Sequence, residues 1–211
     1  MPEYSQIQTY IKCNNEMFPN KVTELVEAIL PLGFNKTSLV EEFSQIEWEV
    51  TEDGLVYVGG GSYDQLLNIN NVNLTVRTYI MGWTPAVIPE LSAVWLEISL
   101  LFHTFEIEDE NETGMLKHPI KPVVWMLLSH ISDYFSETGT FFTNEVTSGI
   151  PWESLMKKGE GIWDFDAAII PEHLTNEYRE IDEELFFFKK NGDRMFFARK
   201  AVWKEDPWLF N

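Results

Sequence analysis

Hydrophobic residues recur every three or four positions in two stretches of the chain, which is the spacing of an amphipathic helix. After Pro119 the series comprises Ile120, Val123, Val124, Leu127, Leu128, Ile131 and Phe135. Nearer the start it comprises Val22, Leu25, Val26, Ile29 and Leu30, between a possible N-cap at Asn20 and a stop at Gly33. We expect helices at both places and a short one from Thr37 to about Gln45, which makes residues 1–45 a helical N-terminal segment.

The middle of the chain has the composition of β-strands. Residues 48–50, 55–58 and 74–81 are β-branched or aromatic runs bounded by Asp-Gly, Gly-Gly-Gly and Asn-Asn. Between Val94 and Phe102, apolar residues alternate with Glu97 and Ser99, which favours a strand with one buried face. A buried helix also fits this last segment, because Trp95 and Leu101 are apolar as well.

A β-hairpin is predicted near the C-terminus. Residues 185–190 and 193–200 flank Asn191-Gly192, a pair that accommodates the positive φ angles of a type I′ turn. Together these elements predict an α+β fold with a mixed or antiparallel sheet, helices packed on it and a C-terminal hairpin. No repeat or Pro/Ser-rich linker divides the chain, so we expect one domain over residues 1–211, with Gly59 to Ser62 as the only break worth considering.

Composition narrows the cellular setting. A chain of 211 residues with 45% hydrophobic residues can bury a sizeable core. Its one cysteine, Cys13, excludes an intramolecular disulfide and a cysteine-based zinc site, which fits a reducing compartment. Residues 1–20 lack the apolar core of a signal peptide, so a cytoplasmic location is expected.

The net charge of −19 decides against some partners. Such a charge repels phosphate backbones and anionic lipid surfaces, so neither nucleic acid nor a membrane is an expected partner. Two explanations stay open: the carboxylates provide solubility, or they attract a basic protein.

No motif points to a catalytic, metal or cofactor site. Gly59-Gly60-Gly61-Ser62 lacks the residues of a nucleotide-binding loop and is interpreted as a turn. His103, His118, His130 and His173 form no close pair or metal-binding motif. Asp164 and Asp166 would point to one side of a strand, but a chain with 34 acidic residues contains such pairs by chance.

Two acidic runs are candidate partner-binding surfaces, because dense carboxylates can accept bidentate bonds from arginine. The first contains Glu106, Glu108, Asp109, Glu110 and Glu112, and the second contains Asp182, Glu183 and Glu184. Either run can instead be an ordinary solvated loop. Trp83 and Trp152, which stand beside Gly or Pro, are the candidate aromatic anchors, because loops hold exposed side chains more often than periodic segments do.

The order of segments over roughly residues 74–171 resembles bacterial suppressor-of-fused-like domains. The resemblance is carried by residues 74–82 (LTVRTYIMG), Pro89-Glu90-Leu91, residues 95–100 (WLEISL), residues 124–128 (VWMLL) and residues 165–171 (FDAAIIP). It implies an α+β fold that works by binding proteins, and many bacterial members look like immunity proteins that neutralise toxins. No catalytic residues transfer. The aromatic C-terminal hairpin and the helical start depart from the family pattern.

The leading hypothesis is therefore a protein-binding domain, in particular an immunity protein that occludes a basic toxin through an acidic surface. One rival is a carboxylate-dependent hydrolase using Asp164, Asp166, Glu97 or His103 in a cleft. A second rival is a small-ligand-binding or structural protein. The sequence leaves the oligomeric state open.

Overall fold

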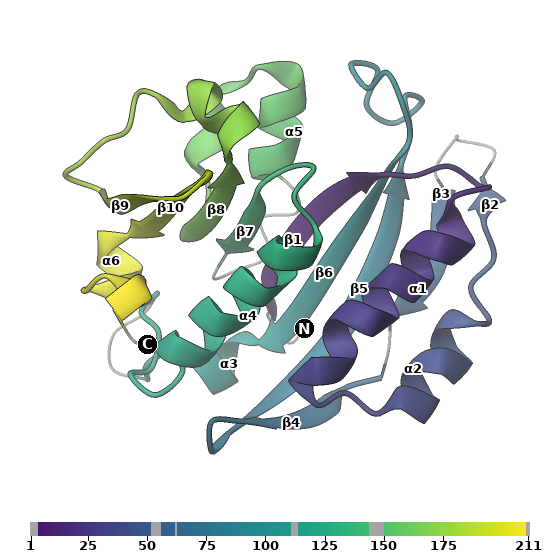
Figure 1. Cartoon of the computed structure of the whole chain (residues 1–211), viewed down its shortest axis with the longest axis horizontal. Helices are drawn as coiled ribbons and strands as arrows, with labels where there is room; N and C mark the ends of the chain where they lie inside the picture. Colours follow the sequence, from purple (N-terminus) through teal and green to yellow (C-terminus); the bar gives the residue numbers. More distant parts are fainter. Residues whose placement is uncertain (1–3, 52–55, 62, 111–113, 144–149, 210–211) are drawn as a thin grey trace.

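An antiparallel sheet of ten strands runs through the molecule (Figure 1). The computed structural model describes residues 4–51, 56–61, 63–110, 114–143 and 150–209. The strands are β1 (Tyr4–Lys12), β2 (Glu49–Val50), β3 (Val56–Gly61), β4 (Gln65–Ile69), β5 (Val72–Trp83), β6 (Trp95–His103), β7 (Thr140–Thr143), β8 (Ala167–Pro171), β9 (Phe186–Asn191) and β10 (Arg194–Arg199). Their order is β2-β3-β5-β6-β1-β7-β8-β10-β9, and β4 also pairs with β5. The predicted α+β class and its C-terminal hairpin are confirmed.

Helices cover the sheet. They are α1 (Phe18–Ile29), α2 (Lys36–Phe43), α3 (Thr104–Ile107), α4 (Lys121–Tyr134), α5 (Ile150–Lys157) and α6 (Lys200–Trp203), with 3₁₀ turns η1 (Leu30–Leu32), η2 (Glu160–Trp163), η3 (Glu172–Tyr178) and η4 (Pro207–Leu209). Figure 1 shows α1 and α4 lying across one face of the sheet, with α2 beside α1. Within the described ranges, no helix has the length and apolar composition to cross a membrane.

Each face of the sheet has its own hydrophobic core, because side chains along a strand alternate between faces. On the face of α1 and α4, Ile7, Ile98 and Leu127 belong to the larger cluster. On the opposite face, Tyr10, Trp152 and residues near η2 and η3 form a smaller, mainly aromatic cluster. The strand predicted at residues 94–102 is confirmed as β6, but both its faces are largely buried, since Glu97 and Ser99 are buried too. The helix after Pro119 is confirmed as α4.

The N-terminal residues correct the expected helical segment. Helices occupy residues 18–29 and 36–43, but Tyr4–Lys12 is β1, a central strand between β6 and β7. The sequence hides this strand because its alternating apolar positions are few and Gln6, Gln8 and Thr9 are polar yet buried. A strand covered on both faces does not show the usual alternation of apolar and polar residues.

Two tight turns place their residues differently from the prediction. In the C-terminal hairpin Asn191 pairs with Arg194, so the loop is Gly192-Asp193, one residue later than expected. Gly192 has a φ of 61° and stands at the first central position, as a type II′ turn requires. The type I′ pattern of two positive φ angles occurs instead at Asn70 and Asn71, between β4 and β5.

The glycine run is neither a turn nor a break between domains. Gly59, Gly60 and Gly61 belong to β3, and the next element is the strand β4, not a helix. A phosphate cradle needs a helix N-terminus after the glycines, so the structure removes that interpretation. Ser62 lies outside the described residues.

Candidate functional site

The first acidic run is partly tied into the fold. The Glu106 carboxylate accepts hydrogen bonds from the backbone N–H and the hydroxyl of Thr75, both at 2.8 Å. The carboxylate of Glu108 accepts from the backbone N–H of Gly114, and Glu108 pairs with Leu116 in a short β-bridge. Asp109 and Glu110 follow at the surface, and Glu112 lies outside the described residues. Two of the five predicted carboxylates therefore hold local structure together.

The second acidic run is exposed immediately before β9. Asp182, Glu183 and Glu184 are all exposed, and an Asp182 carboxylate oxygen accepts from the backbone N–H of Glu184 at 2.9 Å. Lys200 donates to the backbone carbonyl of Glu183 at 2.7 Å. The run is thus an ordered turn with its three carboxylates at the surface.

The two tryptophans predicted as exposed anchors pack inside the protein. Trp152 is 1% exposed and lies in the core of the second face, so its prediction as an anchor is wrong. Pro151 begins α5 next to it, and the helix then carries Trp152 into the core. Trp83 is half-buried, and its indole N–H donates to a Glu97 carboxylate oxygen at 2.9 Å. Neither side chain is available as a free anchor.

Glu97 is the most deeply buried carboxylate among the described residues, at 5% exposure. Besides Trp83, the hydroxyl of Ser99 donates to it at 2.8 Å. Burial raises the pKa of Glu97, and the hydrogen bonds from Ser99, Trp83 and Tyr10 lower it by less. Burial, followed by the nearby charge of Glu97, raises the pKa of Tyr10. The raised pKa means that burial disfavours the charged form of Glu97 more than its hydrogen bonds favour it.

The other residues of the hydrolase hypothesis have partners of their own. His103, at the far end of β6, lies 3.4 Å from the Asp64 carboxylate and packs on the ring of Tyr4. Asp166 lies 3.3 Å from the Arg199 guanidinium, and Asp164 is exposed. Among the described residues no three acidic, histidine or cysteine side chains come together as metal ligands.

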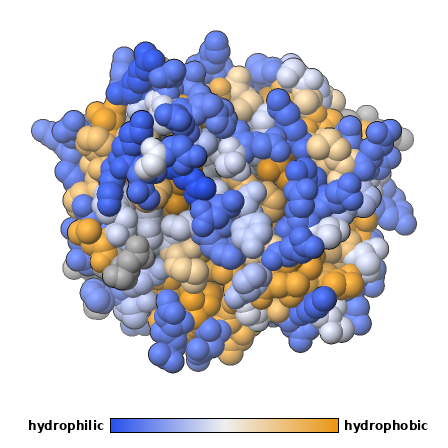
Figure 2. Space-filling model, in the orientation of Figure 1, coloured by the Kyte–Doolittle hydropathy of each residue, from blue (hydrophilic) through white to orange (hydrophobic). Residues whose placement is uncertain are grey.

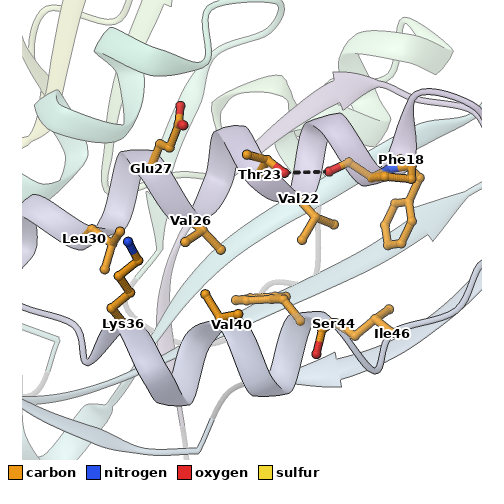
Figure 3. Close-up of a pocket in the computed structure, with 12 residues that line it drawn as sticks. Phe18, Val22, Thr23, Val26, Glu27, Leu30, Lys36, Val40, Ser44 and Ile46 are labelled. Atoms are coloured by element: carbon orange, nitrogen blue, oxygen red, sulfur yellow. Dashed lines mark hydrogen bonds between the residues drawn. The ribbon is translucent and has the colours of Figure 1, made fainter.

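An apolar groove lies between α1 and α2 (Figure 3). One side of α1 packs on the sheet through Leu25, Ala28 and Ile29. Its second apolar stripe consists of Val22, Val26 and Leu30, which follow one another at one-turn intervals and are only half-buried. This stripe forms one wall of the groove.

The second wall comes from α2 and the turn after it. Val40, Phe43 and Ile46 face the first wall, and the cavity between the walls measures about 540 Å³. Figure 3 shows Phe18 and Ile46 at one end and Leu30 and Lys36 at the other. Val40 is 47% exposed although it is a β-branched apolar residue. The groove therefore offers an elongated apolar floor to a ligand.

The segment that forms the groove is acidic, although Glu27 and Lys36 are the charged residues that line the groove itself. Between residues 14 and 50 the acidic residues are Glu16, Glu24, Glu27, Glu41, Glu42, Glu47 and Glu49, and the basic residues are Lys21 and Lys36. Lys21 pairs with Glu24 at 2.8 Å, which leaves Lys36 as the cation lining the groove. Figure 2 shows hydrophobic side chains flanked by hydrophilic ones on the side of the molecule where α1 and α2 lie.

The sequence did not reveal this site, because the five apolar residues of this helical segment share one regular helical spacing. Leu25 and Ile29 point to the sheet, whereas Val22, Val26 and Leu30 form the second stripe. These five residues cover a wider arc of the helix surface than packing against one sheet requires, and this width indicates a second apolar contact. The exposed Val40 on the polar helix α2 was a further signal.

The fold is an antiparallel α+β domain with an apolar groove between α1 and α2. Comparisons of the chain with protein-family models, with curated proteins and with solved structures find no match. The resemblance to suppressor-of-fused-like domains stays a prediction from the segments quoted above.

Proposed function

We propose that this chain is a protein-binding domain that holds a cationic amphipathic segment of its partner in the α1–α2 groove. The observation that supports this most is an apolar groove of about 540 Å³ within a segment that carries seven carboxylates and two lysines. Grooves of this kind accept a helix that lays its apolar side chains on the floor, with anchors at i, i+3 or i+4 and i+7. Basic residues flanking those anchors would meet Glu27 and the other carboxylates of this acidic segment.

The charge of the whole chain supports the same class of partner. A net charge of −19 attracts a basic protein over long distances and speeds their encounter, whereas the buried apolar contacts set how long the complex lasts. The immunity hypothesis names a partner of this chemistry, a basic toxin whose activity is blocked when the domain covers it. The groove replaces the acidic loops as the proposed centre of that interface.

The proposal can be tested with a synthetic helical peptide of leucine and lysine, labelled with fluorescein and titrated with the full chain. A scrambled peptide of equal composition has the same charge but no apolar face, so it measures attraction by charge alone. Fluorescence anisotropy should show that the amphipathic peptide binds at least about tenfold more tightly than the scrambled one. Equal affinities for the two peptides would refute the groove as a helix-binding site.

A matched pair of variants locates the binding surface. Val40→Arg puts a cation on the groove wall and should weaken peptide binding about tenfold or more. Val50→Arg makes the same change at a 63% exposed position on β2, outside the groove lining, and should leave the affinity close to that of the wild type. Equal effects of the two variants would show that the peptide senses net charge only.

The toxin-neutralising form of the proposal needs a cellular test. If the adjacent reading frame encodes a toxin, co-expression of the wild-type chain should rescue growth, Val40→Arg should weaken rescue, and Val50→Arg should not. A triple variant, Glu108→Lys, Asp109→Lys and Glu110→Lys, tests the first acidic run in the same assay. Full rescue by Val40→Arg together with lost rescue by the triple variant would move the interface from the groove to that run.

A further inference from the structure

The strand β9 ends the sheet and has an open edge. Among the described strands it pairs only with β10. Figure 1 shows it at the left margin of the molecule, at the opposite side of the sheet from β2 and β3. An open edge presents backbone N–H and C=O groups to which another strand can pair. The side chains along β9 therefore decide which strand that can be.

The hairpin geometry fixes which backbone groups point outward. Asn191 and Arg194 close the two-residue turn, and the residues that flank such a turn bond to each other across the hairpin. Consistently, Lys200 donates its backbone N–H to the carbonyl of Leu185 at 2.8 Å. The odd-numbered residues of β9 thus face β10. Phe188 and Lys190 turn their N–H and C=O groups toward the open edge.

The charges along this edge complement those of a second copy of the same strand when the two copies run antiparallel. Residues 182–190 read Asp-Glu-Glu-Leu-Phe-Phe-Phe-Lys-Lys, with acids at the start, an apolar middle and two lysines at the end. Leu185 is 50% exposed and Phe188 is 42% exposed, although both are large apolar residues. Lysines on an edge strand usually prevent pairing, but an antiparallel copy brings acids to meet them. No such neutralisation occurs in a parallel arrangement.

We propose that two copies of this chain pair through β9 in antiparallel orientation and form one continuous sheet. With the two-fold axis at Phe187, Phe188 lies opposite Phe186 of the second copy. In the same register Lys190 comes beside the acidic turn that precedes β9 in the second copy, which carries Glu184. The outward N–H of Phe188 donates to the carbonyl of Phe186 in the second copy, and the symmetric bond forms in return. The backbone N–H of Phe186 adds no further bond, because it already donates to the carbonyl of Asp182 at 3.0 Å.

This dimer is independent of the proposed peptide site. The helix α2 packs beside β3, near the end of the sheet opposite β9, so pairing at β9 leaves both α1–α2 grooves open. Loss of dimerisation and loss of peptide binding can therefore be separated by their own variants.

A charge swap tests the register. Sedimentation of the wild-type full chain should show a dimer at about 100 µM, a concentration at which even a weak interface is populated. Lys190→Glu and Glu184→Lys should each raise the dissociation constant about tenfold or more, because like charges then face each other across the interface. The double variant restores opposite charges and should return the dissociation constant to within about threefold of the wild type.

A control separates the local pairing from the change in net charge. Lys158→Glu changes the total charge as Lys190→Glu does, but at an exposed position outside β9, and it should leave dimerisation unchanged. Circular dichroism establishes that each variant is folded. A wild-type chain that stays monomeric at about 100 µM overturns the proposal. A dimer that none of the swaps weakens, or that the double variant fails to restore, overturns it as well.

Discussion

Tyr10 and Trp152 stack face to face, with ring centroids 4.1 Å apart and planes 6° from parallel. The pair joins the central strand β1 to α5, and Trp95 packs edge-on against the same indole at 5.9 Å. Aromatic pairs of this kind add to the free energy gained from burial alone. Trp152 is thus a structural residue, and its removal tests how much the second core contributes.

Trp152→Ala should lower the free energy of unfolding by about 3–5 kcal/mol, the usual cost of removing a buried tryptophan. Urea unfolding followed by far-ultraviolet circular dichroism measures it. Val50→Ala, at an exposed position, serves as the control and should change stability by no more than about 0.5 kcal/mol. A Trp152→Ala protein as stable as this control would contradict the buried position.

Glu97 should make stability depend on pH in a defined direction. Burial raises its pKa in the folded protein, so the folded state binds the proton more tightly than the unfolded state. Stability gained from this group is present at low pH and is lost as pH rises through the folded pKa. The wild type should therefore lose stability relative to Glu97→Gln as pH rises from about 4.5 to 8. Subtracting the two unfolding free energies at each pH cancels the other carboxylates, and a flat difference would contradict the raised pKa.

Gly82 stands where β5 passes β3 too closely for a side chain. A Cβ at this position would lie 2.6 Å from the Val56 Cβ. Gly82→Ala should therefore destabilise the protein by about 1–3 kcal/mol through overpacking. Gly159→Ala is the matched control, because its Cβ would meet nothing closer than 3.6 Å. Thermal unfolding of both variants should give a lower midpoint for Gly82→Ala only.

Cys13 should be chemically inert in the folded protein. Its side chain is buried, and burial raises the pKa of the thiol to about 11. Because the thiolate is the reactive form, only about one molecule in a thousand is reactive at pH 8. A chromogenic disulfide reagent should label the folded chain at least about a hundredfold more slowly than the urea-unfolded chain. Similar rates in both states would contradict the buried thiol.

The sequence predicted those elements whose apolar residues recur at a regular interval, even though both faces of β6 are largely buried. The helix α4 and the strand β6 show a clear period because polar residues interrupt the apolar ones at regular intervals. The strand β1 escaped prediction because Gln6, Gln8 and Thr9 are polar yet buried, and their side chains take part in hydrogen bonds inside the fold. For example, the hydroxyl of Thr9 donates to the carbonyl of Gly139.

The candidate site was harder to predict than the fold. Local context placed Trp152 at the surface because it follows a proline, yet α5 turns it into the core. The groove depends on how far α2 stands from α1, which no periodicity within either helix records. The total charge of the chain did not show which carboxylates are free at the surface. Glu106 and Glu108 accept hydrogen bonds from backbone N–H groups, and the acidic residues of the segment that forms the groove lie elsewhere in the sequence.

The strand β1 joins the two halves of the sheet. It bonds to β6 on one side and to β7 on the other, so each half of the sheet touches the other chiefly through nine residues at the start of the chain. Separately produced fragments should therefore complement each other only when one of them carries this strand. Cleavage by a protease within β1 should separate the two halves of the sheet, whereas cleavage at a peripheral hairpin should leave most of the sheet in place.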